Sequence, residues 1–582
     1  MSRSKLMAIV FLTWKAALRY RFFWVMLVML AFTIGGIPLL VKDDGSAEGM
    51  TQILITYTLS MITAILGAAT LWVSAGSLAT EIENYQLQMV VTKPIPRWQI
   101  WLGKWLGVMS MNLILLLFAG GVVYGMVEYR AKKLTRDALE QLEDRDDQEI
   151  YGIAASSQIM PYEIDPETNR PKLDDNEQPI LRDIQEVRKD VAGIEEKRLR
   201  NTVLIARASI PITDEIRVGN NEKLDGWIES LKQQYLTVRL RQVLRMKNEA
   251  EQQRGKKAGE LSQELDSYEI RQAEIKIEEE IRNYSQVIIP DGRVTLTFRK
   301  PRGWKPADDE RMILRVYFED PKVSFKNDNR YGLQLLCGPT DQPNVVRTPD
   351  GLTLDARTRH EFQIPTSLES NREEGDRQSI FDENGLVSVE LMNRDQGEPD
   401  RNYRAQLKVP FLDNRGRPGG EGVELMYHEG GFAKNYLRAL GIVFAWLGAL
   451  AALGLFAASF MSFAMSAFAC LGVLIISFCV GLMQDVVEDG TVMQTYTEGQ
   501  RDSSYVDSYA VPAFKVMISM IKPVKDYSPI EKLTEGRSIT WGELMRAYGY
   551  IWGISGLTLG VLGSFILSRR QLAITSTNGG GS

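Results

Sequence analysis

Histidine and cysteine are scarce in this sequence, and their scarcity removes several classes of function. The chain of 582 residues contains 2 histidines and 3 cysteines. His360 precedes Glu361, but the second histidine of a His-Glu-x-x-His zinc helix is missing and the pattern there is that of a strand. Cys337 stands alone, and Cys470 and Cys479 lie in an apolar run, so there is no metal-ligand spacing and no disulfide framework. We therefore expect neither a metal site nor histidine-dependent catalysis.

A basic excess and a phosphate-binding loop are also missing. The formal net charge is -6, and no basic stripe with interleaved aromatic residues is present, so nucleic acid is not an expected partner. The Gly-Lys pairs at Gly103 and Gly255 lack the spacing of a Gly-x-x-x-x-Gly-Lys-[Ser/Thr] motif. We therefore do not expect this chain to bind and hydrolyse ATP by that route.

Long apolar runs are concentrated near the two ends of the chain, and nearly all the charge lies between them. A membrane-spanning helix needs about 20 mostly apolar residues. By this measure residues 22–127 predict three transmembrane helices and residues 435–483 predict two, divided near Ser459 to Ser462. A sixth is predicted at 547–568. The expected fold class is thus an α-helical polytopic membrane protein with six transmembrane helices.

The distribution of lysine and arginine predicts the direction of these helices, since cytoplasmic loops are enriched in both. Basic residues collect in segment 1–21, in loop 79–104 and in tail 569–582, whereas the loop after the first helix is mostly acidic. Both termini are therefore expected in the cytoplasm. Segment 1–21 is expected to be an interfacial helix, since Lys15, Arg19 and Arg21 interrupt any signal peptide. Segment 484–546 is predicted as an extracytoplasmic loop with possible interfacial helices.

The cytoplasmic loop has the most specific pattern in the chain. It reads SLATEIENYQLQMVVTKPIPRWQIWLGKWLG. The acidic residues Glu81 and Glu83 precede Pro94 and Pro96, which must interrupt any helix because proline lacks an N–H and restricts the residue before it. Trp98 begins a set of aromatic residues suited to the headgroup level of a bilayer. The pattern predicts a stiff elbow between two helices.

This loop resembles that of the type-2 ABC transporter permeases, in which an acidic helix, a Pro-x-x-Arg-like turn and a Gly-Lys pair precede the third span. The matching residues are Glu81, Pro94, Arg97, Gly103 and Lys104. The stretch MISMIKPVKDYSPIEKLTEGRSITWGELMRAYGYIWG, with a final span ending FILSRRQL, is similar to the last outer loop and final helix of the same family. The segments GGFAKNYLRALG and SFMSFAMSAF also resemble it. The resemblance covers the membrane portions.

The resemblance implies a non-catalytic permease subunit of an exporter-like ABC transporter with an unknown substrate. ATP and magnesium would be bound by a separate ABC ATPase subunit, and this chain would hold no cofactor. A second permease copy or paralogue would complete a dimer in the lipid bilayer of a bacterial cytoplasmic (inner) membrane. The residues expected to couple to the ATPase are Glu81, Glu83, Pro94, Arg97, Trp98, Gly103 and Lys104. The alternative is that they form only a solvated, positively charged loop.

Asn112 is a strongly polar residue at membrane depth, where such side chains usually face a partner helix or a cavity. Two interpretations are open for it: a position on a transport path, or an interhelical hydrogen bond.

Residues 128–434 are predicted to form a soluble extracytoplasmic α+β insertion, which would be periplasmic in a bacterial cell. Region 128–286 is highly charged, and its apolar residues recur at four- and three-residue steps, which predicts long helices or a helical hairpin. Over 287–434 the period changes to two, in RVTLTFR, MILRVYF, YGLQLLC, HEFQIP, LVSVELM and AQLKVP. This predicts an antiparallel β-sandwich of six or seven strands. A sandwich alone does not identify a function.

Two other functions stay open. In one, the helices only anchor a periplasmic scaffold, and no ATPase partner is expected. In the other, a mechanotransmitting ABC subunit binds an ATPase and moves its outer domain without carrying substrate.

Overall fold

The structure is a computed structural model that divides the chain into two compact units. Unit 1 comprises Met1–Ala206 and Gly430–Ser582, and unit 2 comprises Arg207–Glu429. The structure describes residues 3–19, 21–40, 47–84, 96–143, 145–156, 162–163, 172, 180–219, 221–253, 265–306, 310–320, 330–342, 345–349, 351–369, 377–394, 406–413, 416–420, 422–480, 483, 486–487, 496–497, 500–501, 507–525 and 527–569.

Unit 1 is helical, and the described part of the chain contains four helices long and apolar enough to cross a membrane. They are Gly49–Glu83, Arg97–Glu143, Phe432–Ala458 and Trp541–Arg569. The other two predicted crossings fall on shorter apolar stretches, Trp24–Gly36 and Phe463–Ser477. Within the described residues, four of the six predicted spans therefore meet both the length and the composition of a membrane-crossing helix.

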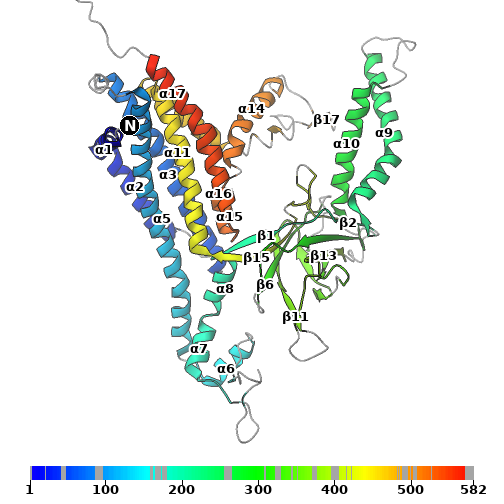
Figure 1. Cartoon of the computed structure of the whole chain (residues 1–582). Coiled ribbons are helices and arrows are strands. Elements are labelled where there is room, and N and C mark those ends of the chain that lie inside the picture. The colour runs from blue at the N-terminus through cyan, green and yellow to red at the C-terminus, as the bar shows by residue number, and fades with distance from the viewer. Residues whose placement is uncertain are drawn as a thin grey trace, which may run out of the picture. The chain divides into compact units, whose positions relative to one another are not determined.

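Figure 1 shows the ribbon coloured in chain order, with elements of unit 1 labelled. Their bounds are α1 (Arg3–Arg19), α2 (Arg21–Leu40), α3 (Ala47–Glu83), α5 (Arg97–Glu143), α6 (Asp147–Ser156), α7 (Ile184–Ala192), α8 (Ile194–Thr202), α11 (Phe432–Ala458), α12 (Phe463–Phe478), β16 (Tyr496–Thr497), β17 (Gln500–Arg501), α14 (Asp507–Lys525), α15 (Pro529–Thr534), α16 (Trp541–Tyr548), the π-helical η2 (Gly549–Gly556) and α17 (Leu557–Arg569).

Helix α5 continues well beyond the predicted end of the third span at residue 127. It has 47 residues, which corresponds to about 70 Å at 1.5 Å per residue. Its polar half is supported by ion pairs one turn apart, from Lys132 to Glu128 and from Lys133 to Asp137. Arg200 of α8 adds a second link to Glu128, with 2.7 Å between Nη2 and Oε1. One helix thus joins the apolar bundle to the charged segment that follows it.

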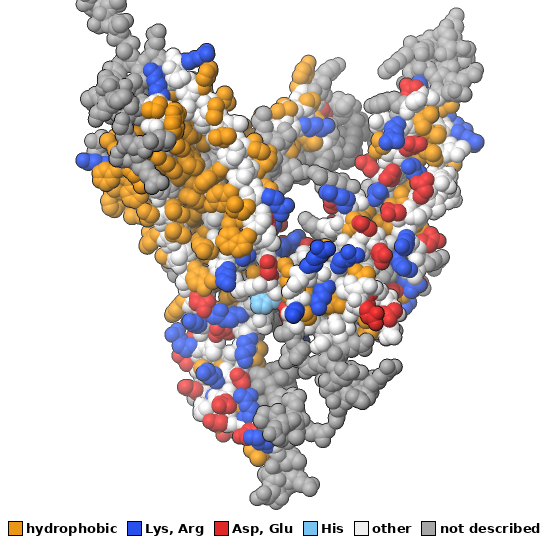
Figure 2. Space-filling model, in the orientation of Figure 1, with side chains coloured by type: hydrophobic (Ala, Val, Ile, Leu, Met, Phe, Trp, Pro, Cys, Tyr) orange, Lys and Arg blue, Asp and Glu red, His pale blue; other side chains and the backbone are white. Residues whose placement is uncertain are grey.

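The apolar bundle of unit 1 exposes many hydrophobic side chains. Figure 2 shows hydrophobic side chains spread over its visible face, with charged side chains gathered where α5 continues. Large apolar residues with half or more of their surface exposed include Trp24, Phe32, Phe118 and Phe565. Contiguous apolar exposure of this kind is unusual for a monomeric protein in water. The chain is therefore suited to association with a membrane.

Unit 2 contains separate antiparallel sheets. One has the strand order β1-β15-β6-β10, and a larger one has the order β3-β2-β5-β13-β7-β8, with β9 also paired to β7. The strand bounds are β1 (Ile205–Ile210), β2 (Arg217–Val218), β3 (Glu222–Lys223), β4 (Val287–Ile288), β5 (Arg293–Arg299), β6 (Arg311–Tyr317), β7 (Arg330–Gly338), β8 (Val346–Arg347), β9 (Thr353–Asp355), β10 (Arg359–Pro365), β11 (Ser367–Glu369), β12 (Arg377–Ser379), β13 (Leu386–Asn393), β14 (Leu407–Lys408) and β15 (Val423–Gly431).

The two larger sheets share one hydrophobic core. Val294, Leu296 and Phe298 alternate along β5 and are buried, as are Leu314 and Val316 on β6, and all five belong to the same cluster. Alternation places successive side chains on opposite faces of a strand, so one face of each sheet supplies this core. The predicted antiparallel strands are therefore confirmed.

Two long helices complete unit 2 and connect β3 to β4. They are α9 (Leu224–Gln253) and α10 (Ser267–Ser285), and they pack against each other. Arg239 of α9 pairs with Glu280 of α10 at 2.8 Å, and the start of α10 has a capping box between Asp266 and Glu269. The boundary between the two compact units therefore lies inside the predicted helical region 128–286, and these two helices belong with the strands.

Candidate functional site

Four helices meet at the end of unit 1 that the sequence predicts to face the cytoplasm. Their side chains form a small buried cluster, which we call the helix-end cluster: Leu78, Ala79, Ile100, Trp101, Ala452, Leu455, Ala458 and Leu567. It joins the last turns of α3, the first turns of α5, the end of α11 and the end of α17. The end of α3 and the start of α5 flank the predicted coupling loop, and we call them its two arms. Both arms therefore pack on the same core.

A buried ion pair links these two arms. Lys104 on α5 lies 2.7 Å from Oε1 of Glu81 on α3, and the exposed fractions of their side chains are 3% and 16%. The lysine Nζ also donates to the carbonyl oxygen of Ser77 at 2.7 Å. A buried ammonium is tolerated only when its charge and its donors are matched in this way. The structure thus brings two of the predicted site residues into direct contact.

Glu83 binds the start of another helix. Its Oε1 accepts a hydrogen bond of 2.8 Å from the backbone N–H of Phe463. Phe463 is the first residue of α12, and the side chain of its N-cap residue, Ser462, makes no capping hydrogen bond. The carboxylate satisfies one of the free N–H groups at a helix start, where negative charge also opposes the helix dipole. Glu83 thereby joins the end of α3 to α12.

Arg97 binds the end of the final helix. Its Nη1 donates to the carbonyl oxygens of Leu567 at 2.6 Å and of Ser568 at 2.7 Å. These are among the last carbonyls of α17, which have no partner within the helix and carry its negative dipole end. A guanidinium is well matched to both properties. Arg97 therefore fixes the start of α5 to α17.

Gly103 permits the close packing of α1 on α5. A Cβ atom at this position would lie 2.8 Å from Cγ2 of Ile9, and one at Gly107 would lie 2.7 Å from Cβ of Thr13. Small residues four positions apart are a common means of close helix approach in membranes. A hydrogen bond of 2.8 Å from Trp14 Nε1 to Ser110 Oγ reinforces the contact. The N-terminal helix is therefore attached to the same arm that carries Lys104.

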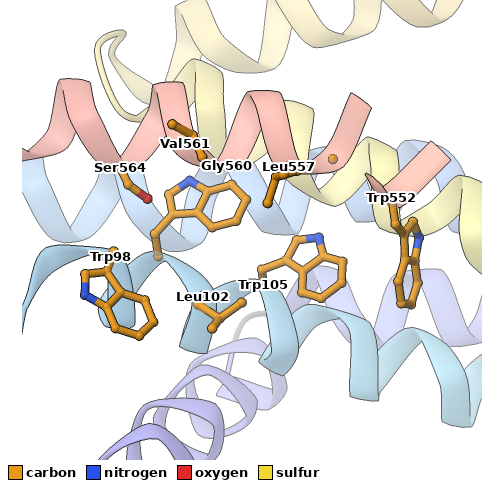
Figure 3. A pocket seen from close by; sticks show the side chains of 10 residues that line it. Trp98, Leu102, Trp105, Trp552, Leu557, Gly560, Val561 and Ser564 are labelled. Atoms are coloured by element: carbon orange, nitrogen blue, oxygen red, sulfur yellow. The ribbon is translucent and has the colours of Figure 1, made fainter. Parts of the chain in front are cut away.

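The tryptophans of α5 line an apolar groove of about 560 Å³ against η2 and α17. Figure 3 shows Trp98 and Trp105 of α5 opposite Leu557 and Gly560 of α17, with Trp552 of η2 beside Trp105. Trp105 and Trp552 each donate from Nε1 to a backbone carbonyl of α11, at 3.0 and 2.9 Å. Trp98 is 44% exposed. Its ring is thus accessible, whereas Trp105 and Trp552 are fixed by hydrogen bonds.

Asn112 lies away from this end and between two helices. Its Nδ2 donates to Thr70 Oγ1 at 2.8 Å, and both residues are 1% exposed. Thr70 in turn donates to the carbonyl oxygen of Leu66 at 2.6 Å. In this structure Asn112 therefore forms a hydrogen bond from α5 to α3.

Sequence reasoning identified most of the charged residues of this site but not what they bind. Pro94 lies outside the described residues. The acceptors and donors that Arg97 and Glu83 use are backbone groups of α17 and α12, which have no signature of their own in the sequence. The lack of a capping hydrogen bond from the Ser462 side chain indicates that another acceptor is needed, but it can be recognised only once the start of α12 is known.

In the described part of the chain, no three His, Cys, Asp or Glu side chains are placed to hold a metal ion. No family model, curated protein or solved structure matches this chain.

Proposed function

We propose that this chain is the permease subunit of an ATP-binding-cassette exporter of the type-2 class, driven by a separate ATPase subunit. The observation that carries the proposal is the set of bonds around the predicted coupling loop. Glu83 contacts α12, Arg97 contacts α17, and the Glu81 to Lys104 pair joins the two arms of the loop. A displacement of the loop by a docked ATPase would therefore reach several membrane helices at once.

In this proposal the protein works in a bacterial cytoplasmic membrane with unit 2 outside the cytoplasm. The partner ATPase supplies the bound ATP and magnesium, and a second permease copy or paralogue completes the assembly. The lack of a phosphate-binding loop in the sequence supports the division of labour. The transported substrate is not specified by these residues.

The direct test is co-purification of the full chain, gently solubilised from its own cells, followed by an ATPase assay. The Glu81→Ala, Glu83→Ala, Arg97→Ala triple variant removes the contacts between the loop and the helices. Since that variant loses structural bonds, the single variant Trp98→Ala is tested as well, because Trp98 is 44% exposed. We expect an ATPase bound to the wild type and reduced in both variants.

The control is Lys132→Ala with Lys133→Ala, which changes exposed cations on the same helix far from the loop. It should retain the ATPase. If the wild type carries no ATPase, the anchored-scaffold interpretation replaces the proposal.

A mechanotransmitting subunit is the second candidate, and the continuity of α5 favours it. The helix runs unbroken from Arg97 at the loop to Glu143, and α7 and α8 pack along its outer part. A rigid helix can transmit a movement at one end to the other. This function requires an ATPase but no substrate flux.

Hydrogen exchange of α7 and α8 in the ATPase complex tests this second candidate. A change on ATP addition that Lys133→Pro abolishes and Lys133→Ala preserves would support it, because proline interrupts the helix. An unchanged exchange pattern would leave only the exporter.

A further inference from the structure

A second groove in unit 1 lies between α5, α11 and α16, and we call it the α5–α11–α16 groove. Its volume is about 480 Å³. Leucines from all three helices form most of its wall, together with Phe444 and Tyr548. The hydroxyl of Tyr548 donates to the carbonyl oxygen of Gly441 at 2.9 Å, so this polar atom already has a partner. The body of the groove is therefore an apolar channel.

One end of the groove carries two cations. Lys434 and Arg438 lie four residues apart on α11, on the same face of the helix, and both line the groove. Among the described residues neither forms an ion pair with a carboxylate. Arg438 donates from Nη1 to the carbonyl oxygen of Ile539 at 2.9 Å, and its guanidinium lies 5.0 Å from the centre of the Trp541 ring. These two contacts orient the arginine but leave its charge uncompensated.

The Nε atom of Arg438 strengthens this observation. It is buried and has no hydrogen-bond partner among the described residues. Cations are costly at membrane depth, and they normally pair with an opposite charge. Two adjacent cations at the end of an apolar channel therefore indicate an anionic ligand with an apolar body.

We propose that the α5–α11–α16 groove binds one anionic phospholipid, with the phosphate at Lys434 and Arg438 and an acyl chain along the leucines. The distance fits. Lys434 and Phe444 are ten residues apart on α11, about 15 Å along the axis, which is about half of a hydrocarbon core roughly 30 Å thick. Free phosphate would occupy only the cationic end, whereas a lipid fills the whole groove. The inference does not depend on the proposed transport function.

The experiment is native mass spectrometry of the full chain in detergent, titrated with phosphatidylglycerol or with phosphatidylcholine of the same acyl chains. We expect the wild type to retain phosphatidylglycerol preferentially. Lys434→Gln, at an exposed side chain, should weaken this binding roughly five-fold, the effect expected of one cation near an anionic lipid. Lys434→Arg should preserve the binding. The Lys434→Gln, Arg438→Gln double variant should lose more.

Two further variants separate the lipid from other ligands. Leu437→Trp adds bulk at a residue that is 60% exposed, so it should obstruct the acyl channel without disturbing the fold. The matched control, Lys132→Gln with Lys133→Gln, removes two cations whose carboxylate partners are present on the same helix, and it should bind as the wild type does.

Several outcomes would overturn the inference. Equal retention of the two lipids would do so, as would equal losses in the control and the Lys434 variant. Competition by inorganic phosphate at the same concentration would indicate an anion site without a lipid channel. A change in the number of chains per particle, with lipid binding unchanged, would assign the cations to a protein partner instead.

Discussion

Single charged residues join several helices of unit 1 to one another. Lys104, Glu83 and Arg97 each satisfy groups on a helix other than their own. The resemblance of the loop singled out these three residues in the sequence, and two interpretations were open for Asn112, a position on a transport path or an interhelical hydrogen bond. The sequence could not predict backbone partners such as the carbonyl of Leu567, because a peptide group is the same in every residue.

The Glu81 to Lys104 pair provides the first prediction at this scale. Glu81→Ala leaves a buried ammonium without its counter-charge and should destabilise unit 1 by about 3 kcal/mol. Glu83→Ala, whose carboxylate is exposed and serves as a helix cap, should cost about 1 kcal/mol. Thermal unfolding of the two variants in detergent measures the difference. Equal shifts would mean that the pair contributes little beyond ordinary hydrogen bonding.

Cys337 provides a second residue-scale prediction. It is 2% exposed on β7, and burial raises the pKa of its thiol to about 12. At pH 8 only about one thiol in ten thousand would then be ionised, and the thiolate is the reactive form. In isolated unit 2, where it is the sole cysteine, maleimide should react only after denaturation. Rapid labelling of the folded unit at pH 8 would contradict the burial described here.

At the scale of elements, periodicity located most strands and helices correctly. The pattern RVTLTFR corresponds to β5 and LVSVELM to β13, and the break expected near Ser459 to Ser462 falls between the end of α11 at Ala458 and the start of α12 at Phe463. The length of α5 was missed because the part of the helix after residue 127 is charged. The apolar run ends at residue 127, whereas the helix continues to Glu143, where helix propensity and ion pairs one turn apart stabilise it.

The close approach of α1 to α5 leads to a prediction with an internal control. Gly107→Ala places a Cβ atom 2.7 Å from Thr13 and should destabilise the chain by about 1–3 kcal/mol, because the packing leaves no space. Gly121→Ala on the same helix has nothing within 4 Å. It should be neutral or stabilising, since alanine favours a helix over glycine by about 1 kcal/mol. Thermal unfolding of both variants measures the two changes in stability. Similar losses of stability in the two variants would refute close packing at Gly107.

The link between α8 and α5 should depend on pH. Burial raises the pKa of Glu196, but the hydrogen bonds from Thr135 and Arg200 have the larger combined effect and lower it. The pKa of Glu196 therefore lies below the ordinary 4.5. A carboxylate with a lowered pKa stabilises the fold fully above its unfolded value, and that contribution disappears as the pH falls through the folded value. We expect α8 to loosen below about pH 4.5. Hydrogen exchange between pH 3.5 and 6 should show this in the wild type, and Glu196→Gln should reduce the pH dependence of the link, leaving only the part that comes from the pair of Arg200 with Glu128.

At the scale of the whole molecule, unit 2 has the properties of an independent domain. Its core cluster draws on both large sheets and on α9 and α10. Its first and last strands, β1 and β15, are hydrogen-bonded neighbours in one sheet, so the chain enters and leaves through the same edge region. A domain with adjacent ends and its own core can fold by itself.

A segment of residues 205–431 should therefore be soluble and should unfold in one cooperative transition. It includes the complete β1 and β15, whereas a segment starting at residue 211 lacks β1 and should be less stable. Circular dichroism during heating compares the two. A broad, non-cooperative transition of the longer segment would show that its stability comes from the rest of the chain.

The adjacency of β1 and β15 also bears on how such a protein can originate and be redesigned. Because both junctions of unit 2 lie on neighbouring strands, recombination needs only two breakpoints to insert or exchange the whole unit within the reading frame of a membrane gene. The same two breakpoints are where a short hairpin turn could replace the unit, giving a minimal membrane protein, or where a reporter domain with closely spaced termini could be grafted.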